Sequence, residues 1–532
     1  MLRTILQKEC RFHLAGFPLR VGMLLTLVLT ASSTLIATRD YNLRLSDYRD
    51  RVAAHARALR EETVYSFLQP VVVRPPEPLS VLDQGFDAHL GSEVPIHLFD
   101  IPAEARGGYW GNEFLGPSPA ADLTTIVAIV LGLLALLLAL DAFHSERESG
   151  TLSSLLALGV PRGILLTGKI LGGLLSLALP LAGALLVSLA IFVLQVDTLS
   201  SSQWLRAAGL TAAYLSYLSL MFLLGLLVSM PVQSRSRALA VAVVVWLATV
   251  LVLPGTVRTL VADLGSSQEA RQAAARRSAE LLAERDQRLA EEQRREPLRA
   301  VFSGDHASSF SNGPNRAVRY RYGSAVYYDA LSAYYRIEIA TGMRYAEAVF
   351  TERQRFEERL RSTERLATAF ALISPAALLD GLSEELAGTS IGEYDRFLAA
   401  CRSYRLALIR YLGSKDAFAS WRWFTDDPPE RLHPWPRFLG LAPEEVEPEE
   451  VRRLFERFGD PKVASRVRRE QARFERDPAR RLQIDEVPRF ADPGAGFLEC
   501  LRRGAPEAFG LLLLNVLALI AVAARFRRWL PG

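Results

Sequence analysis

Six apolar runs constrain the fold of this chain more than any other feature of its sequence. The hydrocarbon core of a bilayer is about 30 Å thick, and a helix needs roughly 17 to 25 mostly apolar residues to cross it. Since backbone polar groups must be satisfied internally in lipid, each run is expected to form an α-helix. The expected spans are residues 21–37, 123–140, 170–194, 205–230, 238–261 and 505–524.

The overall composition agrees with a membrane protein and argues against a nucleic-acid partner. Of the 532 residues, 50% are hydrophobic, and the mean hydropathy is positive, at +0.14. Soluble domains rarely bury so large an apolar fraction. The formal net charge is only +4, and we find no arginine-aromatic pattern typical of an RNA-binding module. We therefore expect the lipid bilayer as a partner and no nucleic acid.

The N-terminal segment allows two interpretations. Residues 1–20 are amphipathic and carry four Lys or Arg residues, which predicts an interfacial helix on the cytoplasmic leaflet. The first apolar run, 21–37, has 17 residues without a charge. A cleaved signal peptide is the alternative, but the apolar core of such a peptide usually has about 7 to 15 residues. We favour an uncleaved first span.

Basic residues in the short connecting segments set the predicted orientation, because long loops do not obey the charge rule. Lys or Arg occurs near both termini and in the links 144–169 and 231–237, but not in the turn 196–203. This places both termini in the cytoplasm. The predicted organisation is then 1–38 (interfacial helix and first span), 39–121 (extracytoplasmic segment), 122–262 (spans two to five, with a cytoplasmic helix at 144–160), 263–504 (extracytoplasmic helical domain) and 505–532 (sixth span and basic tail).

The two extracytoplasmic regions differ in character. The first looks helical from Leu43 to Leu68 and is then rich in proline, which predicts loop. The second contains a polar helix at 265–296 whose narrow apolar stripe requires a partner, and a seven-residue apolar repeat supplies one. Tyrosines at 320–335 indicate either helix packing or a ligand platform, and tryptophans at 421–435 either a membrane-interface loop or a satellite core. The repeat is Val349, Phe356, Thr363 and Phe370.

The spans carry no chemistry that we can assign. None has an Asp, Glu, Lys or Arg near its middle, where such a residue costs about 2.5 to 3.5 kcal/mol, which argues against an ion-coupled carrier. We find no paired aspartates, H-E-x-x-H or G-x-S-x-G of an intramembrane protease. We identify no catalytic residue and no metal-binding pattern of Cys or His. Cys401 and Cys500 are both predicted outside the cytoplasm, so a disulfide bond between them is one alternative and two free thiols are the other.

The segment 141–169 is a short charged stretch between the second and third spans. Ser145 and Glu148 have the spacing of a capping box, in which each side chain satisfies a backbone N–H of the other. Residues 151–156 then predict a short helix that is apolar on one side, ended by a glycine and a proline. Such a helix is suited to docking on a soluble partner. The alternative is a plain interfacial turn whose leucines lie among lipid headgroups.

This stretch resembles the coupling segment of ABC-2 type permeases, the membrane subunits of one class of ATP-driven transporters. Their motif is close to E-x-E-x-G-T-L, followed by leucines, a proline and G-K. The resemblance implies contact with an ABC ATPase present in two copies, a second permease (a copy or a paralogue), and a place in the bacterial cytoplasmic (inner) membrane. The residues implied in coupling are Glu146, Arg147, Glu148, Gly150, Thr151, Leu152, Leu155, Leu156, Gly168 and Lys169.

One nucleotide-binding pattern inside this stretch is misleading. Residues 163–169 have the G-x4-G-K spacing of a phosphate-binding loop, but Ile170 occupies the Ser/Thr position that would hold magnesium. No strand is expected before it. We therefore expect no cofactor in this chain and no enzymatic activity of its own, with ATP and Mg in the partner ATPase.

A second resemblance covers the larger extracytoplasmic region. Residues 373–376 and 386–389, with positions near 397–405 and 487–490, are similar to a subgroup of these permeases that bears an outer domain of unknown function, number 3526. The motif residues are Ser374, Pro375, Ala387, Gly388 and Thr389.

The two resemblances and the hydropathy pattern lead to one predicted architecture and two predicted functions. The fold class is an all-α membrane protein of six transmembrane helices, with a large helical extracytoplasmic domain between spans 5 and 6 and a smaller one between spans 1 and 2. The favoured function is the permease subunit of an ABC-2 type exporter that works as a dimer. The alternative is an ATPase-driven envelope scaffold or force-transmitting protein that carries no substrate.

Overall fold

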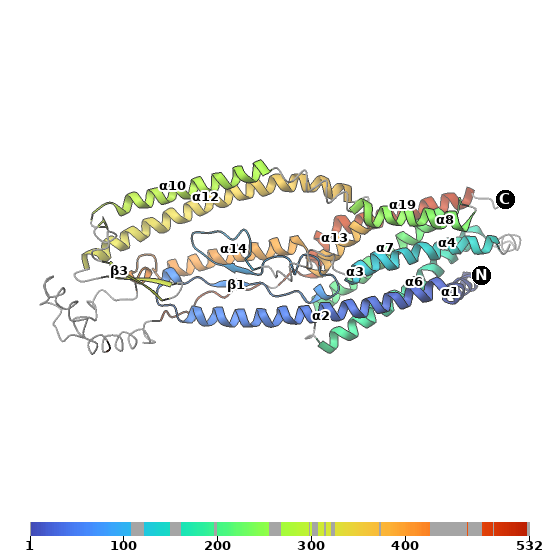
Figure 1. The fold of residues 1–532 in the computed structure, drawn as a ribbon, viewed down its shortest axis with the longest axis horizontal. Coiled ribbons are helices and arrows are strands. Elements are labelled where there is room, and N and C mark those ends of the chain that lie inside the picture. Colours follow the sequence, from blue (N-terminus) through green and yellow to red (C-terminus); the bar gives the residue numbers. More distant parts are fainter. Residues whose placement is uncertain are drawn as a thin grey trace.

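The protein is an elongated, almost entirely helical molecule whose two termini lie at the same end (Figure 1). The structure is a computed structural model. We call the end with the termini the termini end and the helices running from it the bundle. The described residues are 2–107, 122–148, 161–195, 199–232, 234–254, 268–296, 298–299, 307–312, 315–320, 325–371, 374–425, 465, 481–492 and 494–528.

Six helices of the described part are long and apolar enough to cross a membrane, which confirms the predicted number of spans. Two of them contain a π-helical stretch, η4 in the second and η5 in the fifth. The elements of the bundle are α1 (Leu2–Ala15), α2 (Phe17–Arg60), α3 (Leu123–Ile126), η4 (Val127–Leu131), α4 (Gly132–Glu148), α6 (Arg162–Gln195), α7 (Ser201–Ser229), α8 (Arg235–Leu247), η5 (Ala248–Val252) and α19 (Ala505–Arg528).

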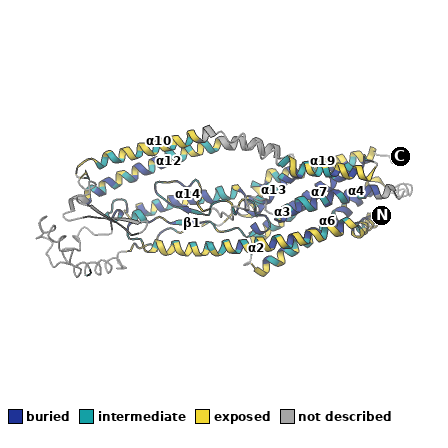
Figure 2. Ribbon diagram, viewed as in Figure 1, coloured by how far each residue is buried: buried dark blue, intermediate teal, exposed yellow. Residues whose placement is uncertain are grey.

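Helices α4 and α7 form the centre of the bundle. In the second span 67% of the most apolar window is buried, against 22% in the first. Gly225 permits the close approach, since a Cβ there would lie 2.6 Å from the Cβ of Ala139. Tyr214, Tyr217 and Phe222 of α7 are fully buried. Figure 2 shows the same contrast, with dark α4 and α7 inside and exposed residues along α2.

Helix α2 corrects one predicted boundary. The first span and the predicted helix from Leu43 to Leu68 are a single helix of 44 residues that ends at Arg60. At 1.5 Å per residue this is about 66 Å, roughly twice the thickness of the hydrocarbon core. No glycine or proline interrupts the chain between residues 23 and 60, so nothing in the sequence ends the helix at the membrane surface.

Helix α1 is separate from α2, as predicted, but its buried side faces protein. Ile5, Glu9 and His13 are buried, one turn apart, against α6. An apolar stripe alone would suit a lipid surface, whereas a buried glutamate at its centre requires a partner.

The elements beyond the bundle form what we call the distal domain. It contains helices and two pairs of short antiparallel strands. The proline-rich part of the segment 39–121 contributes one of these pairs and, as expected, little helix. The elements are η1 (Tyr65–Phe67), β1 (Val71–Val73), η2 (Pro78–Val81), β2 (Glu93–Pro95), α10 (Gln268–Gln293), β3 (Ala307–Asn312), β4 (Asn315–Tyr320), α12 (Ala325–Ala371), α13 (Pro375–Ala387), α14 (Ile391–Ser414), η6 (Trp421–Trp423) and α18 (Phe497–Arg503).

Helices α10 and α12 pair antiparallel, as the sequence predicted (Figure 1). The Tyr345 hydroxyl lies 2.7 Å from Glu284, and Gln293 lies 2.5 Å from the Tyr334 hydroxyl. Tyr334 and Tyr345 are buried in this contact, whereas Val349 and Phe356 of the predicted repeat are half-buried; the side chains of Thr363 and Phe370 lie outside the described part. We call this helix pair the arm.

A second hydrophobic core fills the distal domain. Tyr328 and Tyr335 pack on Phe424, and Trp423 is buried beside them, which supports the packing interpretation of both aromatic stretches. The Trp423 turn contacts η1, beyond the far end of α2. Cys401 belongs to this core and Cys500 to the core of the bundle, and both are free thiols, so the disulfide alternative is wrong.

Candidate functional site

The predicted coupling segment begins inside a helix. Glu146, Arg147 and Glu148 form the last turn of α4, which continues from the second span. The predicted capping box at Ser145 is therefore wrong, since Ser145 lies within α4 rather than at the start of a new helix. The continuing helix outweighs the local capping signal because each added residue completes one more backbone hydrogen bond. The rest of the segment, with Gly150, Thr151, Leu152, Leu155 and Leu156, lies outside the described residues.

The other two predicted coupling residues, Gly168 and Lys169, lie near the start of α6. The Lys169 ammonium is fully buried and donates hydrogen bonds to Glu9 of α1 (3.1 Å) and to the carbonyl of Ala142 in α4 (2.6 Å). It also lies 5.3 Å from the centre of the Phe143 ring, within the range of a cation–π contact. One side chain thus joins three helices at the termini end; we call Glu9 and Lys169 the clamp.

The sequence analysis missed Glu9, although a signal was present. Glu9 is the only acidic residue in a basic helix, and it lies one turn from Ile5 and from His13. Burial, and secondarily the nearby Lys169, lowers the pKa of His13 to about 4, so this imidazole stays neutral beside the clamp. Gly168 permits α1 to approach, since a Cβ there would lie 2.5 Å from Ile5.

Further contacts fix the last turns of α4 to the other helices. His144 lies 3.1 Å from the Ser229 hydroxyl of α7, and Phe143 packs on Phe526 of α19 at 5.7 Å. Asp141 forms an ion pair with Arg235 of α8 at 2.8 Å. The helix that leads into the predicted coupling segment therefore contacts α6, α7, α8 and α19 through its last turns.

The predicted motif of the outer domain lies where the distal domain meets the bundle. Ser374 caps α13 by accepting a hydrogen bond from the Ala377 N–H, and its hydroxyl donates to the carbonyl of Thr249. Pro375 occupies the first turn, where proline is favoured. Gly388 ends the helix with φ of 76°, in the left-handed region that favours glycine.

Arg206 of α7 holds the end of α13 against the bundle. Its guanidinium donates to the carbonyls of Leu386 (2.8 Å) and Ala387, and it pairs with Glu77 at 3.1 Å. The Thr389 carbonyl accepts from the Phe86 N–H at 2.9 Å. We call this contact region the junction. It joins the fourth span, the first distal segment and α13, and it contains the motif residues Ala387, Gly388 and Thr389.

Two carboxyl groups are buried at the same junction. Asp122 caps α3 through the Thr125 N–H and accepts a second bond from the Gln84 N–H. Asp83 accepts from the Thr124 hydroxyl at 3.2 Å. Burial raises the pKa of Asp83 well above its ordinary value, and the nearby carboxyls of Asp122 and Glu384 raise it further. Burial also raises the pKa of Asp122.

No group of three or more His, Cys, Asp or Glu side chains in the described ranges is placed to hold a metal ion. The polar contacts of the clamp and of the junction join helices that lie far apart in the sequence.

Comparisons with known proteins agree with the membrane-spanning helices described above. Residues 16–297, more than half of the chain, match the family model described as ABC-2 family transporter protein, and residues 319–491 match a domain of unknown function, DUF3526. The first match covers α2 to α10, and the second covers α12 to α14 and η6.

Two curated relatives carry the name probable ABC transporter permease protein NosY. The protein from Pseudomonas aeruginosa is 42% identical over 86 residues, which is 16% of this chain and 30% of the relative. The protein from Stutzerimonas stutzeri is 36% identical over 140 residues, or 26% of this chain and 50% of the relative. The chain thus spans half or less of the length of either relative. With the family match and six helices able to cross a membrane, the chain is a multi-pass membrane protein that belongs to the ABC-2 family of transporter proteins.

Proposed function

We propose that this chain is the permease subunit of an ABC exporter, working as a dimer with a two-copy ATPase that holds ATP and Mg. The dimer is formed by a second copy or a paralogue. Its place is the bacterial inner membrane, with the termini end in the cytoplasm. The clamp is the observation that carries the proposal, because it fastens α1, α4 and α6 together directly behind the predicted coupling segment.

The mechanism follows from the two helices that flank this segment. Helix α4 ends at Glu148 and α6 begins at Arg162, so a push on the residues between them acts on both helices. The clamp makes α1 move with them, and α4 is also attached to α7, α8 and α19. Closure of the ATPase pair then tilts several spans at once. A buried ion pair suits this role, since removing one partner costs about 3–5 kcal/mol.

Two substitutions in the segment test the proposal. Glu148→Arg reverses a charge at the docking surface and Leu155→Asp removes an apolar contact, so each is expected to release the ATPase or to uncouple its hydrolysis from transport. The measurements are the amount of ATPase that co-purifies and the hydrolysis that depends on transport. Glu280→Arg, an equal charge reversal in the arm, is the control. Normal retention and activity in both segment variants would show that coupling occurs elsewhere.

One observation favours the alternative, a force-transmitting protein that carries no substrate. Helix α2 runs unbroken from the first span into the distal domain, where Arg44 pairs with Asp87 and Arg51 with Glu93. Ala54→Pro would interrupt this helix beyond the span, at an exposed position. A transporter should keep its transport-dependent hydrolysis in that variant, whereas a protein that acts through α2 should lose its effect on envelope partners.

A further inference from the structure

A cavity of about 330 Å³ in the distal domain plays no part in the proposed coupling. It lies between α12, the segment after α2, the loop at 97–100 and η6, and its volume is within the range of small-molecule sites. Its lining is Ser66, Gln69, His97, Leu98, Phe99, Asp100, Tyr335, Glu338 and Trp423. The tyrosine and tryptophan stretches that stand out in the sequence therefore meet at one place.

Three aromatic rings of this lining are held in place by packing. Tyr335 stacks on Phe424, with ring centres 5.0 Å apart and planes 12° apart. Trp423 is only 2% exposed and packs edge-on against Phe418. Phe99 lies against α12 at Gly342, where a Cβ would come within 2.5 Å of its ring. Rings fixed in this way need no further ordering to receive a ligand.

The charges that line the cavity are negative. Glu338 lies one turn after Tyr335 on α12 and forms no hydrogen bond or ion pair within the described residues. Burial raises its pKa to about 6, so it is mostly ionised at neutral pH. Asp100, on the opposite loop, is exposed. Burial lowers the pKa of His97, which keeps this ring neutral.

No arginine lines the cavity, although the charge of Arg285 lies near enough to Glu338 to lower its pKa against the effect of burial. Arg285 of α10 pairs with Asp286 at 2.7 Å. Arg405 of α14 donates to the carbonyls of His97 and Leu98. The cavity therefore joins aromatic faces to two carboxylates without a lining cation, and this combination attracts positive charge.

We propose that this cavity binds a small organic cation of the alkylammonium class, enclosed by Phe99 and Tyr335 above the buried Trp423 and neutralised by Glu338 and Asp100. Aromatic faces attract a cation within about 6 Å of the ring centre, and quaternary ammonium groups are bound in this way. A metal ion does not suit the site, since the described residues offer no group of three ligands and aromatic walls do not coordinate hard cations.

Choline and its uncharged isostere, 3,3-dimethylbutan-1-ol, are the probes. Each is titrated into the purified full-length chain without an ATPase, with tryptophan fluorescence and calorimetry as measurements, so the result does not depend on the proposed transport function. We expect choline to bind and the alcohol to bind at least about tenfold more weakly, because only the charge differs. Glu338→Gln should weaken choline binding about tenfold, and the control Glu352→Gln, on the same helix, should leave it unchanged.

The outcomes decide the proposal in both directions. Absence of choline binding up to about 10 mM, equal binding of the alcohol, or equal affinity in Glu338→Gln would overturn it. Thermal unfolding of each variant shows whether it is folded. Asp100→Asn, at an exposed position, supplies a second variant if Glu338→Gln does not fold, and we expect it to weaken choline binding about threefold or more. An unchanged affinity in that variant would also count against the site.

Discussion

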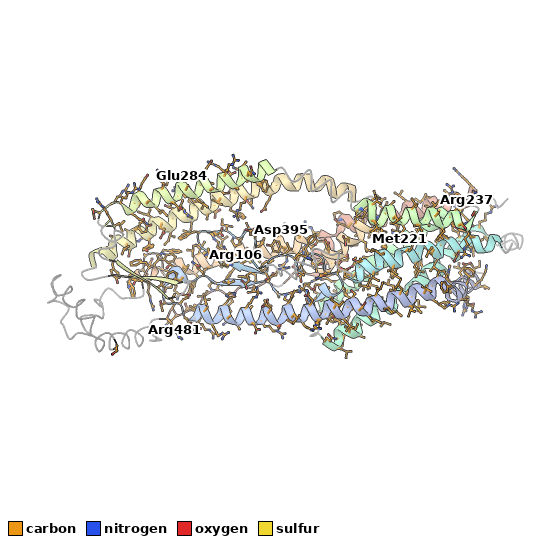
Figure 3. The ribbon with its side chains drawn as sticks, in the orientation of Figure 1. Arg106, Met221, Arg237, Glu284, Asp395 and Arg481 are labelled. Carbon is orange, nitrogen blue, oxygen red and sulfur yellow. The ribbon has the colours of Figure 1, made fainter. Side chains whose placement is uncertain are left out.

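The junction joins the bundle to the distal domain and the arm joins two helices within that domain, and the two are built from different contacts. At the junction, Arg206 is 4% exposed and satisfies two carbonyls and a carboxylate. Within α10 of the arm, Arg277 and Glu280 form an ion pair in which the side chains are 57% and 63% exposed. In Figure 3, Glu284 is labelled on the arm and Met221 in the bundle.

This difference indicates which part of the distal domain moves with the spans. Exposed ion pairs contribute about 0–1 kcal/mol, whereas breaking a buried pair costs several times as much. Segments with few buried contacts open locally at low free energy. We infer that α13, held at the junction, follows the fourth span, while the pairing of α10 with α12 opens independently.

Arg206→Met should have the largest effect on the junction. It leaves Glu77 without its counter-charge and two carbonyls without a donor, so we expect a loss of about 3–5 kcal/mol in the free energy of unfolding. Chemical unfolding of the purified chain measures the loss, and hydrogen exchange at residues 386–389 locates it. The control Arg277→Met, in the arm, should cost no more than about 1 kcal/mol. Equal losses in the two variants would remove the distinction between junction and arm.

The buried carboxyls predict a pH dependence of the junction. Because the pKa of Asp83 is raised in the folded chain, the folded state binds its proton more tightly than the unfolded state. The junction should therefore be most stable at low pH and lose stability as the pH rises through the folded pKa, by about 1.4 kcal/mol for each unit of the shift. The raised pKa of Asp122 acts in the same direction.

Hydrogen exchange at the junction, corrected for the intrinsic rate at each pH, measures this dependence. The charged groups that face Asp83 are Asp122 from the segment before α3, and Asp380 and Glu384 from α13. Asp83→Asn keeps the acceptor for Thr124 but cannot ionise, so it should flatten the pH profile. A profile as steep as that of the unmodified chain would assign the dependence to another group.

Gly388→Ala should have an intermediate effect. The residue has φ of 76°, and a Cβ would lie 2.2 Å from the Arg206 guanidinium. The backbone conformation alone costs a non-glycine residue about 1–2 kcal/mol. Gly413→Ala is the matched control, because Gly413 lies within α14, where a Cβ would make only an ordinary contact with Phe418 at 3.9 Å and alanine favours a helix. A similar unfolding free energy in both variants would mean that the end of α13 tolerates a side chain.

The sequence predicted the spans because hydropathy is a local property. The number of spans followed directly, and so did the pairing of α10 with α12, since an amphipathic stripe requires a partner. The end of α2 was misplaced because the first span has no terminating residue. The predicted capping box at Ser145 failed for a similar reason, since the second span continues as one helix to Glu148.

Local sequence patterns did not predict the contacts that join helices at the termini end and at the junction. Glu9 and Lys169 are 160 positions apart, and Arg206 and Ala387 are 181 apart. A resemblance pointed to Lys169 and Gly388, but it did not show what either residue touches. The structure shows these partners. Lys169 pairs with Glu9, and the Arg206 guanidinium holds the end of α13, where Gly388 lies.

The smallest effect is expected for Tyr345→Leu in the arm. The substitution removes the hydroxyl that bonds Glu284 and the ring beside Arg288, but it keeps an apolar side chain in the contact between α10 and α12. We expect faster proteolysis within 268–296, since the arm opens more often, and an unchanged global unfolding transition. Arg355→Met, at an exposed ion pair of α12, is the control and should alter neither measurement.

If Tyr345→Leu instead lowers the global transition as far as Arg206→Met does, the arm and the junction unfold as one unit. The independent opening of the arm would then be wrong, because a locally opening segment cannot set the stability of the whole chain.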